Sequence, residues 1–180
     1  KCGRVARAAR LEVVQGAHGV NLRGLVRCHS VWSCPMCSAV IRSERAQQLA
    51  SAVRAHLVEG GADFLTLTVP HSVADSLSKV YSLVASAWSA LLRDRSLRTF
   101  RSKYGWLGFV RTVEVTYSRR GNDFHPHVHA LDFWSSPVSL DVLAEYRRLV
   151  LKVWQRAVMR LGGGLPSEAH GVDLVPVFDE

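Results

Sequence analysis

Three histidines at alternate positions, His125, His127 and His129, form the feature that most constrains this chain. Successive side chains of a β-strand point to opposite faces, so His127 and His129 are expected to share one face of a strand. His125 has the same parity, although Pro126 interrupts the run. Two imidazoles side by side on a strand form half of a metal site. A polar strand face that carries histidines by chance is the alternative, and the rest of the chain decides between them.

A predicted β-hairpin supplies a third ligand. Residues 108–117 have the composition of a strand, and turn-forming residues separate them from the histidine strand. A two-residue turn at 120–121 places Glu114 opposite His127, and a turn shifted by one residue places it opposite His129. Both registers put the three side chains on one face, whereas an odd-length loop puts Glu114 on the other. Glu114, His127 and His129 are therefore predicted ligands of a divalent ion.

A second metal site is predicted near the start of the chain. All the cysteines fall within the first 37 residues, with the spacing Cys2-x25-Cys28-x5-Cys34-x2-Cys37. Close Cys spacing without a secretion signal indicates metal binding rather than disulfides. Four thiolates form the closed tetrahedral site of structural Zn²⁺. His29 and His18 are weaker candidates for the fourth position.

The charge distribution indicates a polyanionic partner. The net charge is +8, and residues 1–60 and 61–120 each carry nine Lys or Arg against three and four Asp or Glu. Nucleic acid is the expected partner of such a basic chain, although a solvated surface explains many of these charges equally well. The predicted DNA contacts are Arg42, Arg45, Arg98, Arg101, Lys103, Arg119 and Arg120.

The remaining pattern predicts an α+β fold with an antiparallel sheet. Strand-like segments are expected at 11–14, 20–26, 64–69, 108–117, 124–131 and 171–178, the last at an edge because of Pro176. Helices are expected over 38–57, after an N-cap at Ser72, and after an N-cap at Ser139. The expected buried stripes are Val73, Leu77, Val80, Val84, Trp88 and Leu91 in one helix, and Leu143, Val150, Trp154 and Leu161 in another.

No apolar run approaches the roughly 20 residues of a membrane span, and the first residues lack the apolar region of a signal peptide. The chain also lacks an initiator Met, which is expected of a fragment. We predict a zinc-binding module at 1–37 and a larger domain at 38–180.

The order of these motifs resembles that of the rolling-circle plasmid replication initiators, the Rep proteins of the HUH endonuclease superfamily. Residues 28–37 look like their Cys-Pro-x-Cys zinc element, and residues 64–70 look like their first motif. Residues 114–117 with 125–131 look like their metal-binding hairpin, so the resemblance spans nearly the whole chain. It implies an antiparallel-sheet palm flanked by helices. It also implies nicking and joining of single-stranded origin DNA with Mg²⁺ or Mn²⁺ at Glu114, His127 and His129.

The resemblance further implies a tyrosine nucleophile that forms a 5′-phosphotyrosine and lies on a helix after the final strand. The chain stops at Glu180, so the fragment is expected to bind metal and DNA without nicking. Tyr146, on the helix after the histidine strand, is the one substitute nucleophile considered. A bacterial cytoplasmic protein is implied, with a host helicase as a candidate partner and the oligomeric state left open.

Three other functions fit parts of the pattern. A related HUH transposase would share the zinc module and the histidine motif. Two His and one carboxylate also build non-haem Fe(II) oxygenase sites, although the basic charge and the zinc module argue against that class. A non-catalytic, zinc-stabilised DNA-binding module is the third alternative.

Overall fold

The computed structural model describes residues 2–16, 19–119 and 123–178. The chain divides into two compact units, Lys1–Ala55 and His56–Glu180. The predicted α+β class is confirmed, and every strand pair in the two sheets is antiparallel. None of the helices in the described part of the chain is long and apolar enough to cross a membrane.

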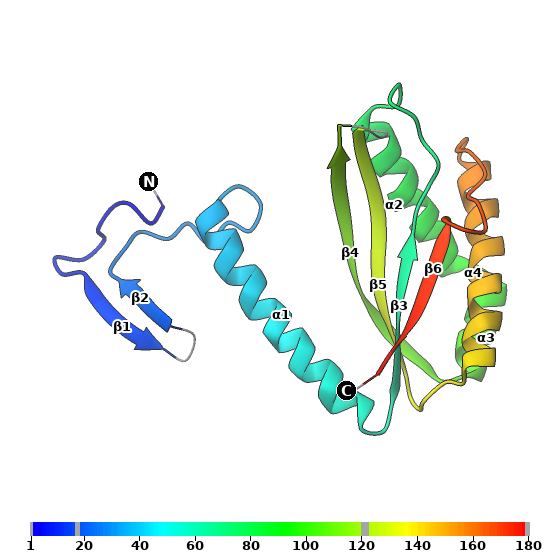
Figure 1. Ribbon diagram of the computed structural model, residues 1–180, viewed down its shortest axis with the longest axis horizontal. Helices are drawn as coiled ribbons and strands as arrows, with labels where there is room; N and C mark the ends of the chain where they lie inside the picture. Colours follow the sequence, from blue (N-terminus) through cyan, green and yellow to red (C-terminus); the bar gives the residue numbers. More distant parts are fainter. Residues whose placement is uncertain (1, 17–18, 120–122, 179–180) are drawn as a thin grey trace. The chain divides into compact units, whose positions relative to one another are not determined.

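The first unit contains a small sheet and most of a long helix. Strands β1 (Glu12–Gly16) and β2 (Gly19–Arg23) form the predicted hairpin, and helix α1 (Pro35–Leu57) follows (Figure 1). Pro35 opens α1 because the first helical position needs no backbone N–H donor. Among the described residues of this unit, the buried apolar side chains are Cys34 and Cys37 alone. The thiols therefore replace the apolar core that a unit of this size would otherwise need.

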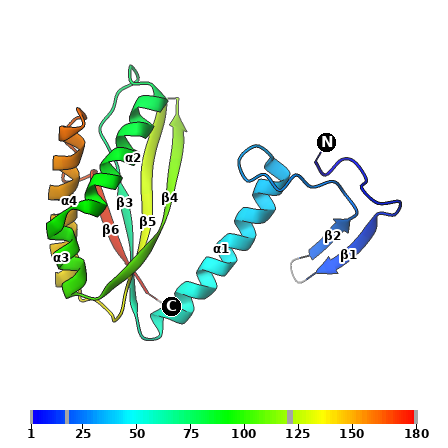
Figure 2. The same ribbon diagram turned by 180° about the vertical axis from the view of Figure 1, so that it is seen from behind.

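The second unit is a four-stranded sheet covered by helices. The strands, in the spatial order β4-β5-β3-β6, are β3 (Gly61–Leu67), β4 (Trp106–Ser118), β5 (Asp123–Trp134) and β6 (Val172–Val177). The helices are α2 (Leu77–Arg93), α3 (Arg95–Lys103) and α4 (Leu140–Arg160). Figures 1 and 2 show all three on one face of the sheet. Within this unit, the helices leave the other face uncovered.

Alternation along the strands separates the core from the uncovered face. Val128 and Ala130 of β5 and Leu65 of β3 point toward the helices and are buried. They pack with Val84 of α2 and Trp154 of α4 in one core cluster. The histidines of β5 have the opposite parity, so they lie on the uncovered face. The core thus fixes the strand that carries the predicted metal ligands.

The helix ends correct two sequence predictions. Ser72 was predicted to cap a helix that begins with Val73, but Ser72 instead forms a turn with Asp75, and α2 begins after Ser76. Val73 is consequently 63% exposed. Leu161 was predicted to be buried, but α4 ends at Arg160 and Leu161 is 48% exposed.

A buried polar network lies between the sheet and α3 and α4. Asp63 and Asp132 are cross-strand partners with no exposed surface. Trp134 Nε1 donates to Asp63 Oδ2 at 2.6 Å, and the Tyr146 hydroxyl donates to Asp132 Oδ2 at 2.9 Å. Arg101 is the cation nearest to the two carboxylates, 3.7 Å from Asp132 Oδ2. Burial, reinforced by the nearby Asp132 charge, raises the pKa of Asp63 to about 7.

We expect Asp63→Asn to stabilise the second unit at pH 8 by about 1–3 kcal/mol, with little effect at about pH 3.5, where the folded and unfolded chains both keep the proton. The folded-state pKa of Asp63 is raised, so the fold binds a proton that the unfolded chain has released above about pH 4. Stability from this group is therefore fully present below about pH 4 and is lost progressively as the pH rises from there to about 7. Chemical denaturation at both pH values measures the effect. Glu145→Gln is the control, because it makes the same carboxylate-to-amide change at an exposed position. It should change stability by only a few tenths of a kcal/mol. An equal effect of the two substitutions would contradict the prediction.

Candidate metal centres

Glu114, His127 and His129 converge on the uncovered face of the sheet. The register pairs Glu114 with His127 directly, which confirms the first of the two predicted registers. Glu114 Oε2 lies 3.1 Å from His129 Nε2 and 3.5 Å from His127 Nε2. Strand β5 continues through Pro126, because β3 ends at Leu67 opposite Val128 and leaves Pro126 unpaired on that side.

The imidazoles of His127 and His129 are each held through Nδ1, the ring nitrogen that does not face Glu114. His127 Nδ1 donates to the carbonyl oxygen of His125 at 3.0 Å. His129 Nδ1 lies 3.0 Å from Thr66 Oγ1, and Phe64 stacks on the same ring at 5.1 Å. Such contacts fix the tautomer and aim Nε2 at the bound ion in metal sites. Sequence patterns do not identify Thr66 or Phe64, because the register of β3 against β5 joins residues 63 positions apart.

The three ligand atoms fit a divalent ion. They all lie within 4.8 Å of one another. Ligand bonds of about 2.1 Å at right angles place neighbouring donor atoms roughly 3.0 Å apart, close to the separations from Glu114. His127 is 8% exposed, whereas the Glu114 side chain is 55% exposed, so the site opens to solvent on the carboxylate side. The group is therefore able to hold a metal ion while leaving room for a further ligand.

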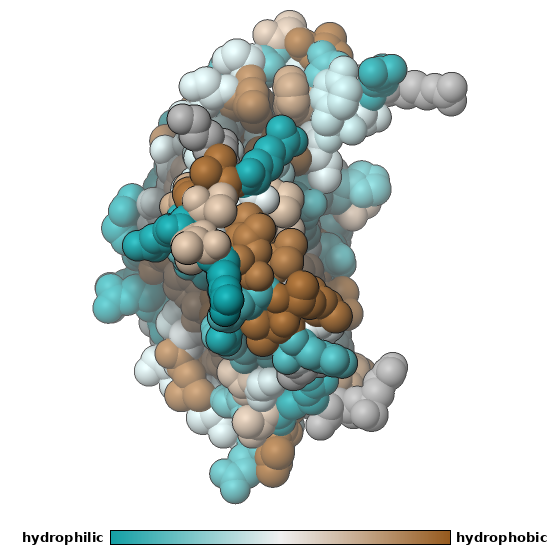
Figure 3. All heavy atoms as spheres, turned by 90° about the vertical axis from the view of Figure 1, so that its left-hand side faces the viewer, coloured by the Kyte–Doolittle hydropathy of each residue, from teal (hydrophilic) through white to brown (hydrophobic). Residues whose placement is uncertain are grey.

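The surface around this group is partly apolar. Apolar and hydrophilic side chains also both reach the surface on the side of the protein that Figure 3 shows, which is the left-hand side of Figure 1. On the uncovered sheet face, Phe64, Val110 and Val175 are 40%, 46% and 49% exposed. His125 stacks with His71 at 4.9 Å, and burial followed by the charges of His71 and His127 lowers its pKa. The group therefore lies at the border between a polar and an apolar surface.

The four cysteine sulfurs form a second group. All four lie within 4.8 Å of one another, with Cys2 Sγ 3.2 Å and Cys28 Sγ 3.8 Å from Cys37 Sγ. Zn–S bonds of about 2.3 Å in a tetrahedron require S···S separations of roughly 3.8 Å. None of the four forms a disulfide. The set fits a tetrahedral metal site without His29, and His18 lies outside the described residues.

Backbone pairing explains how distant cysteines meet. Gly3 N donates to the carbonyl oxygen of Val26, which brings Cys2 beside Cys28. Cys34 immediately precedes α1, so its sulfur lies at a helix N-terminus, where thiolates are favoured. The backbone N–H of Cys37, followed by the Cys2 thiol, lowers the pKa of Cys34 to about 7. The thiolate form that binds metal is therefore favoured at Cys34. At Cys2 the backbone N–H of Cys28 lowers the pKa, but the Cys37 thiol and burial outweigh it and raise the pKa to about 12.

Glu114, His127 and His129 are called the Glu-His-His group below. Tyr146 does not lie at this group, which corrects its prediction as a substitute nucleophile. It is fully buried, and Arg101 Nε and Nη2 donate to its hydroxyl at 2.9 and 2.6 Å. Its partner Asp132 points to the helix-covered face, opposite to His127 and His129. Burial raises the pKa of Tyr146 well above its usual value. A hydroxyl in the core on the wrong face of the sheet has no access to a phosphate.

The predicted DNA contacts fall into three groups. Arg101 is 4% exposed and is engaged by Tyr146, so it is a core residue and not a surface contact. Arg120 lies outside the described residues. The others are exposed, namely Arg42, Arg45, Arg98, Lys103 and Arg119. Arg101 shows that charge density along a sequence does not distinguish a basic surface from a buried cation.

Comparison with known proteins identifies the family. A family model described as "Replication protein" matches residues 20–137. A "Protein rep" of Streptomyces lividans is 26% identical over 92% of this chain and 46% of its own length. A "Protein rep" of Streptococcus pneumoniae is 31% identical over 54% of this chain and 30% of its own length. The chain thus spans about half or less of the length of these relatives.

Solved structures resemble the chain only weakly. A phage SAM lyase in complex with S-methyl-5′-thioadenosine aligns with 67% of this chain and 91% of its own, at 13% identity and a TM-score of 0.34. That score is too low to bear on the fold. The family match covers most of the chain and includes the cysteines from Cys28 onward and the three predicted ligands Glu114, His127 and His129. The chain therefore belongs to the replication protein (Rep) family, the rolling-circle initiators that its motifs resemble.

Proposed function

We propose that the protein carrying this chain nicks and rejoins single-stranded origin DNA with a divalent ion held by Glu114, His127 and His129. The observation that most directly supports this proposal is the convergence of these three side chains, with both imidazoles held through Nδ1. A four-stranded antiparallel sheet with helices on one face supports the palm of the HUH nucleases.

The side chains have separate roles in this proposal. Mg²⁺ or Mn²⁺, when bound, would polarise the scissile phosphate and neutralise developing charge. Glu114 supplies the hard oxygen ligand that these ions prefer, from the exposed side of the site. The carbonyl oxygen of His125 holds the His127 Nδ1 proton, which keeps Nε2 free to bind the ion. The cysteine group would hold structural Zn²⁺ and fold the first unit.

We further propose that the nucleophile is none of the tyrosines present here. Tyr81 and Tyr146 lie on α2 and α4, which cover the opposite face of the sheet. Tyr104 follows α3, and Tyr117 has the opposite parity to Glu114 on β4. No hydrogen bond in the described part of the chain links a tyrosine to the three ligands.

We expect the 180-residue chain to bind origin DNA without forming a covalent adduct. The assay mixes the chain with end-labelled single-stranded origin DNA and Mn²⁺ and separates the products on a denaturing protein gel. The longer Rep protein of Streptomyces lividans, assayed in parallel with and without the metal, is the positive control and tests the metal requirement. A covalent adduct on the chain would contradict the prediction, and peptide mapping would then identify the reacting tyrosine. Nicking by the longer protein without a divalent ion would overturn the proposed function.

A further inference from the structure

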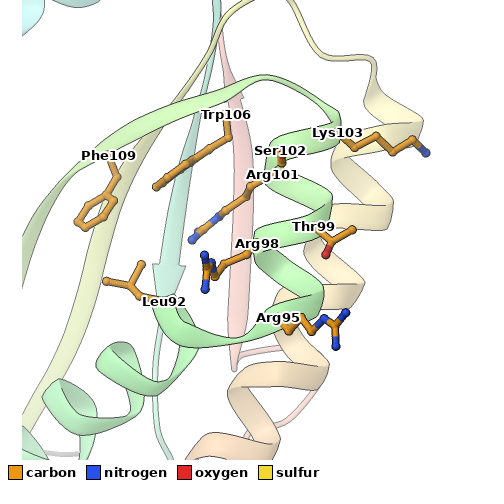
Figure 4. A pocket seen from close by; sticks show the side chains of 9 residues that line it. All are labelled: Leu92, Arg95, Arg98, Thr99, Arg101, Ser102, Lys103, Trp106 and Phe109. Carbon is orange, nitrogen blue, oxygen red and sulfur yellow. The ribbon is translucent and has the colours of Figure 1, made fainter.

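A large cavity of the second unit lies away from the Glu-His-His group, between α3 and the start of β4. Its volume is about 1130 Å³. Its lining carries four cations and no carboxylate. The lining residues are Leu92, Arg95, Arg98, Thr99, Arg101, Ser102, Lys103, Trp106 and Phe109 (Figure 4). Such a volume slightly exceeds the roughly 300–1,000 Å³ range of small-ligand sites.

The four cations differ in whether other residues already engage their charged groups. Arg101 is held by Tyr146 and Asp132, with its guanidinium carbon 4.4 Å from the centre of the Trp106 ring, and thereby forms part of the floor. Arg98 extends toward the same interior in Figure 4, whereas Lys103 extends away. Arg95 and Arg98 are exposed, and neither forms an ion pair within the described residues. Two arginines are thus free to bind an anion at the mouth of the cavity.

Aromatic rings form the opposite wall. Trp106 and Phe109 stack with ring centres 6.0 Å apart, and Trp88 supports Phe109 edge-on at 5.2 Å. Rings beside free arginines suit an unpaired nucleotide, because the base stacks on the ring and the phosphate pairs with the guanidinium. The bases of duplex DNA are paired and stacked inside the helix, so a duplex would bind this cavity only through phosphate contacts with the arginines.

We propose that this cavity is a second binding site for single-stranded DNA, with phosphates at Arg95 and Arg98 and bases against Trp106 and Phe109. Strand β4 connects it to the metal group, because Glu114 lies five residues after Phe109 on the same strand, roughly 17 Å along it. The two sites lie on opposite faces of the sheet, and β4 is an edge strand. A DNA strand that occupies both sites passes over this edge.

The test measures how tightly the chain binds fluorescein-labelled oligothymidylate, by anisotropy without Mg²⁺ or Mn²⁺. Arg95→Ala/Arg98→Ala should weaken binding by about tenfold and reduce the salt dependence, d log K/d log [salt], by about 1.4 for two lost phosphate contacts. Arg148→Ala/Arg160→Ala removes the same charge from α4, outside the cavity, and should weaken binding by less than about threefold. The assay contains no divalent ion and measures no cleavage, which separates this result from the proposed nicking function.

A second measurement needs no substitution. Photocrosslinking of an iododeoxyuridine oligonucleotide to the parent chain should map to Trp106 or Phe109. Equal weakening by the two double variants, or crosslinks only elsewhere, would overturn the proposal. Displacement of the oligonucleotide by polyglutamate as effectively as by unlabelled DNA would also overturn it and identify an acidic peptide as the ligand instead.

Discussion

Replacing Cys34 and Cys37 by serine is expected to unfold the first unit of the chain and to leave the second unit folded. The two thiols are the only buried apolar side chains among the described residues of the first unit. The second unit has its own core, from Leu65 to Val172. Zinc binding of about 10–16 kcal/mol accounts for the folding of comparable thiolate modules, so its loss exceeds the stability that a hairpin retains.

Amide hydrogen exchange followed by mass spectrometry measures this effect on each unit separately. Protection should disappear from β1 and β2 and persist in β3 and β5, and a zinc chelator should have the same effect on the parent chain. Met36→Ser is the matched control, because Met36 lies between the same cysteines, is 53% exposed and supplies no thiolate. Retained protection of the β1–β2 hairpin in the serine variant would show that the thiols do not hold the unit together.

Replacing His127 and His129 by alanine in any nicking-competent Rep protein that contains this chain is expected to reduce nicking by at least about a hundredfold. Both substitutions remove a nitrogen that points at Glu114, and neither removes an apolar core side chain. Binding to origin DNA should change by less than about threefold, since phosphate contacts supply most of that affinity. Cleavage of labelled origin DNA and anisotropy on the same DNA measure the two effects.

Thr112→Ala is the matched control, because Thr112 is the cross-strand partner of His129 on the same face but lies outside the three-ligand group. Mn²⁺ binding to the 180-residue chain, measured by electron paramagnetic resonance, provides a readout that is independent of nicking. It should be lost in the double alanine variant and retained with Thr112→Ala. Full nicking by the alanine variant would exclude the proposed metal centre and favour a zinc-stabilised DNA-binding module.

Local patterns predicted which side chains converge at the Glu-His-His group, whereas they missed the contacts that tertiary packing creates. Parity and an even-length turn were enough to place Glu114 opposite His127, because a hairpin register depends on neighbouring residues. One helix start was predicted wrongly, since Ser72 and Ser76 are both residue types that cap helices and α2 begins after Ser76. Ser139 caps α4 as predicted.

The buried network could not be predicted in the same way. Asp132 has the alternating parity of a buried strand position, but its partners Arg101 and Tyr146 come from two helices. Charge alone therefore assigned Arg101 to a DNA surface, and position in the chain alone suggested Tyr146 as a nucleophile. Buried hydrogen bonds between distant elements leave no periodic signal, and this is where both assignments were wrong.

The three proposed ligands differ in how firmly the sheet holds the strand that carries them. His127 and His129 belong to β5, which has β4 on one side and β3 on the other. Glu114 belongs to the edge strand β4, and its side chain is more than half exposed. Ion exchange is therefore expected to proceed through Glu114, which swings away while the imidazoles keep their places. The same asymmetry leaves the third ligand as the position at which evolution can change the metal preference without rebuilding the sheet.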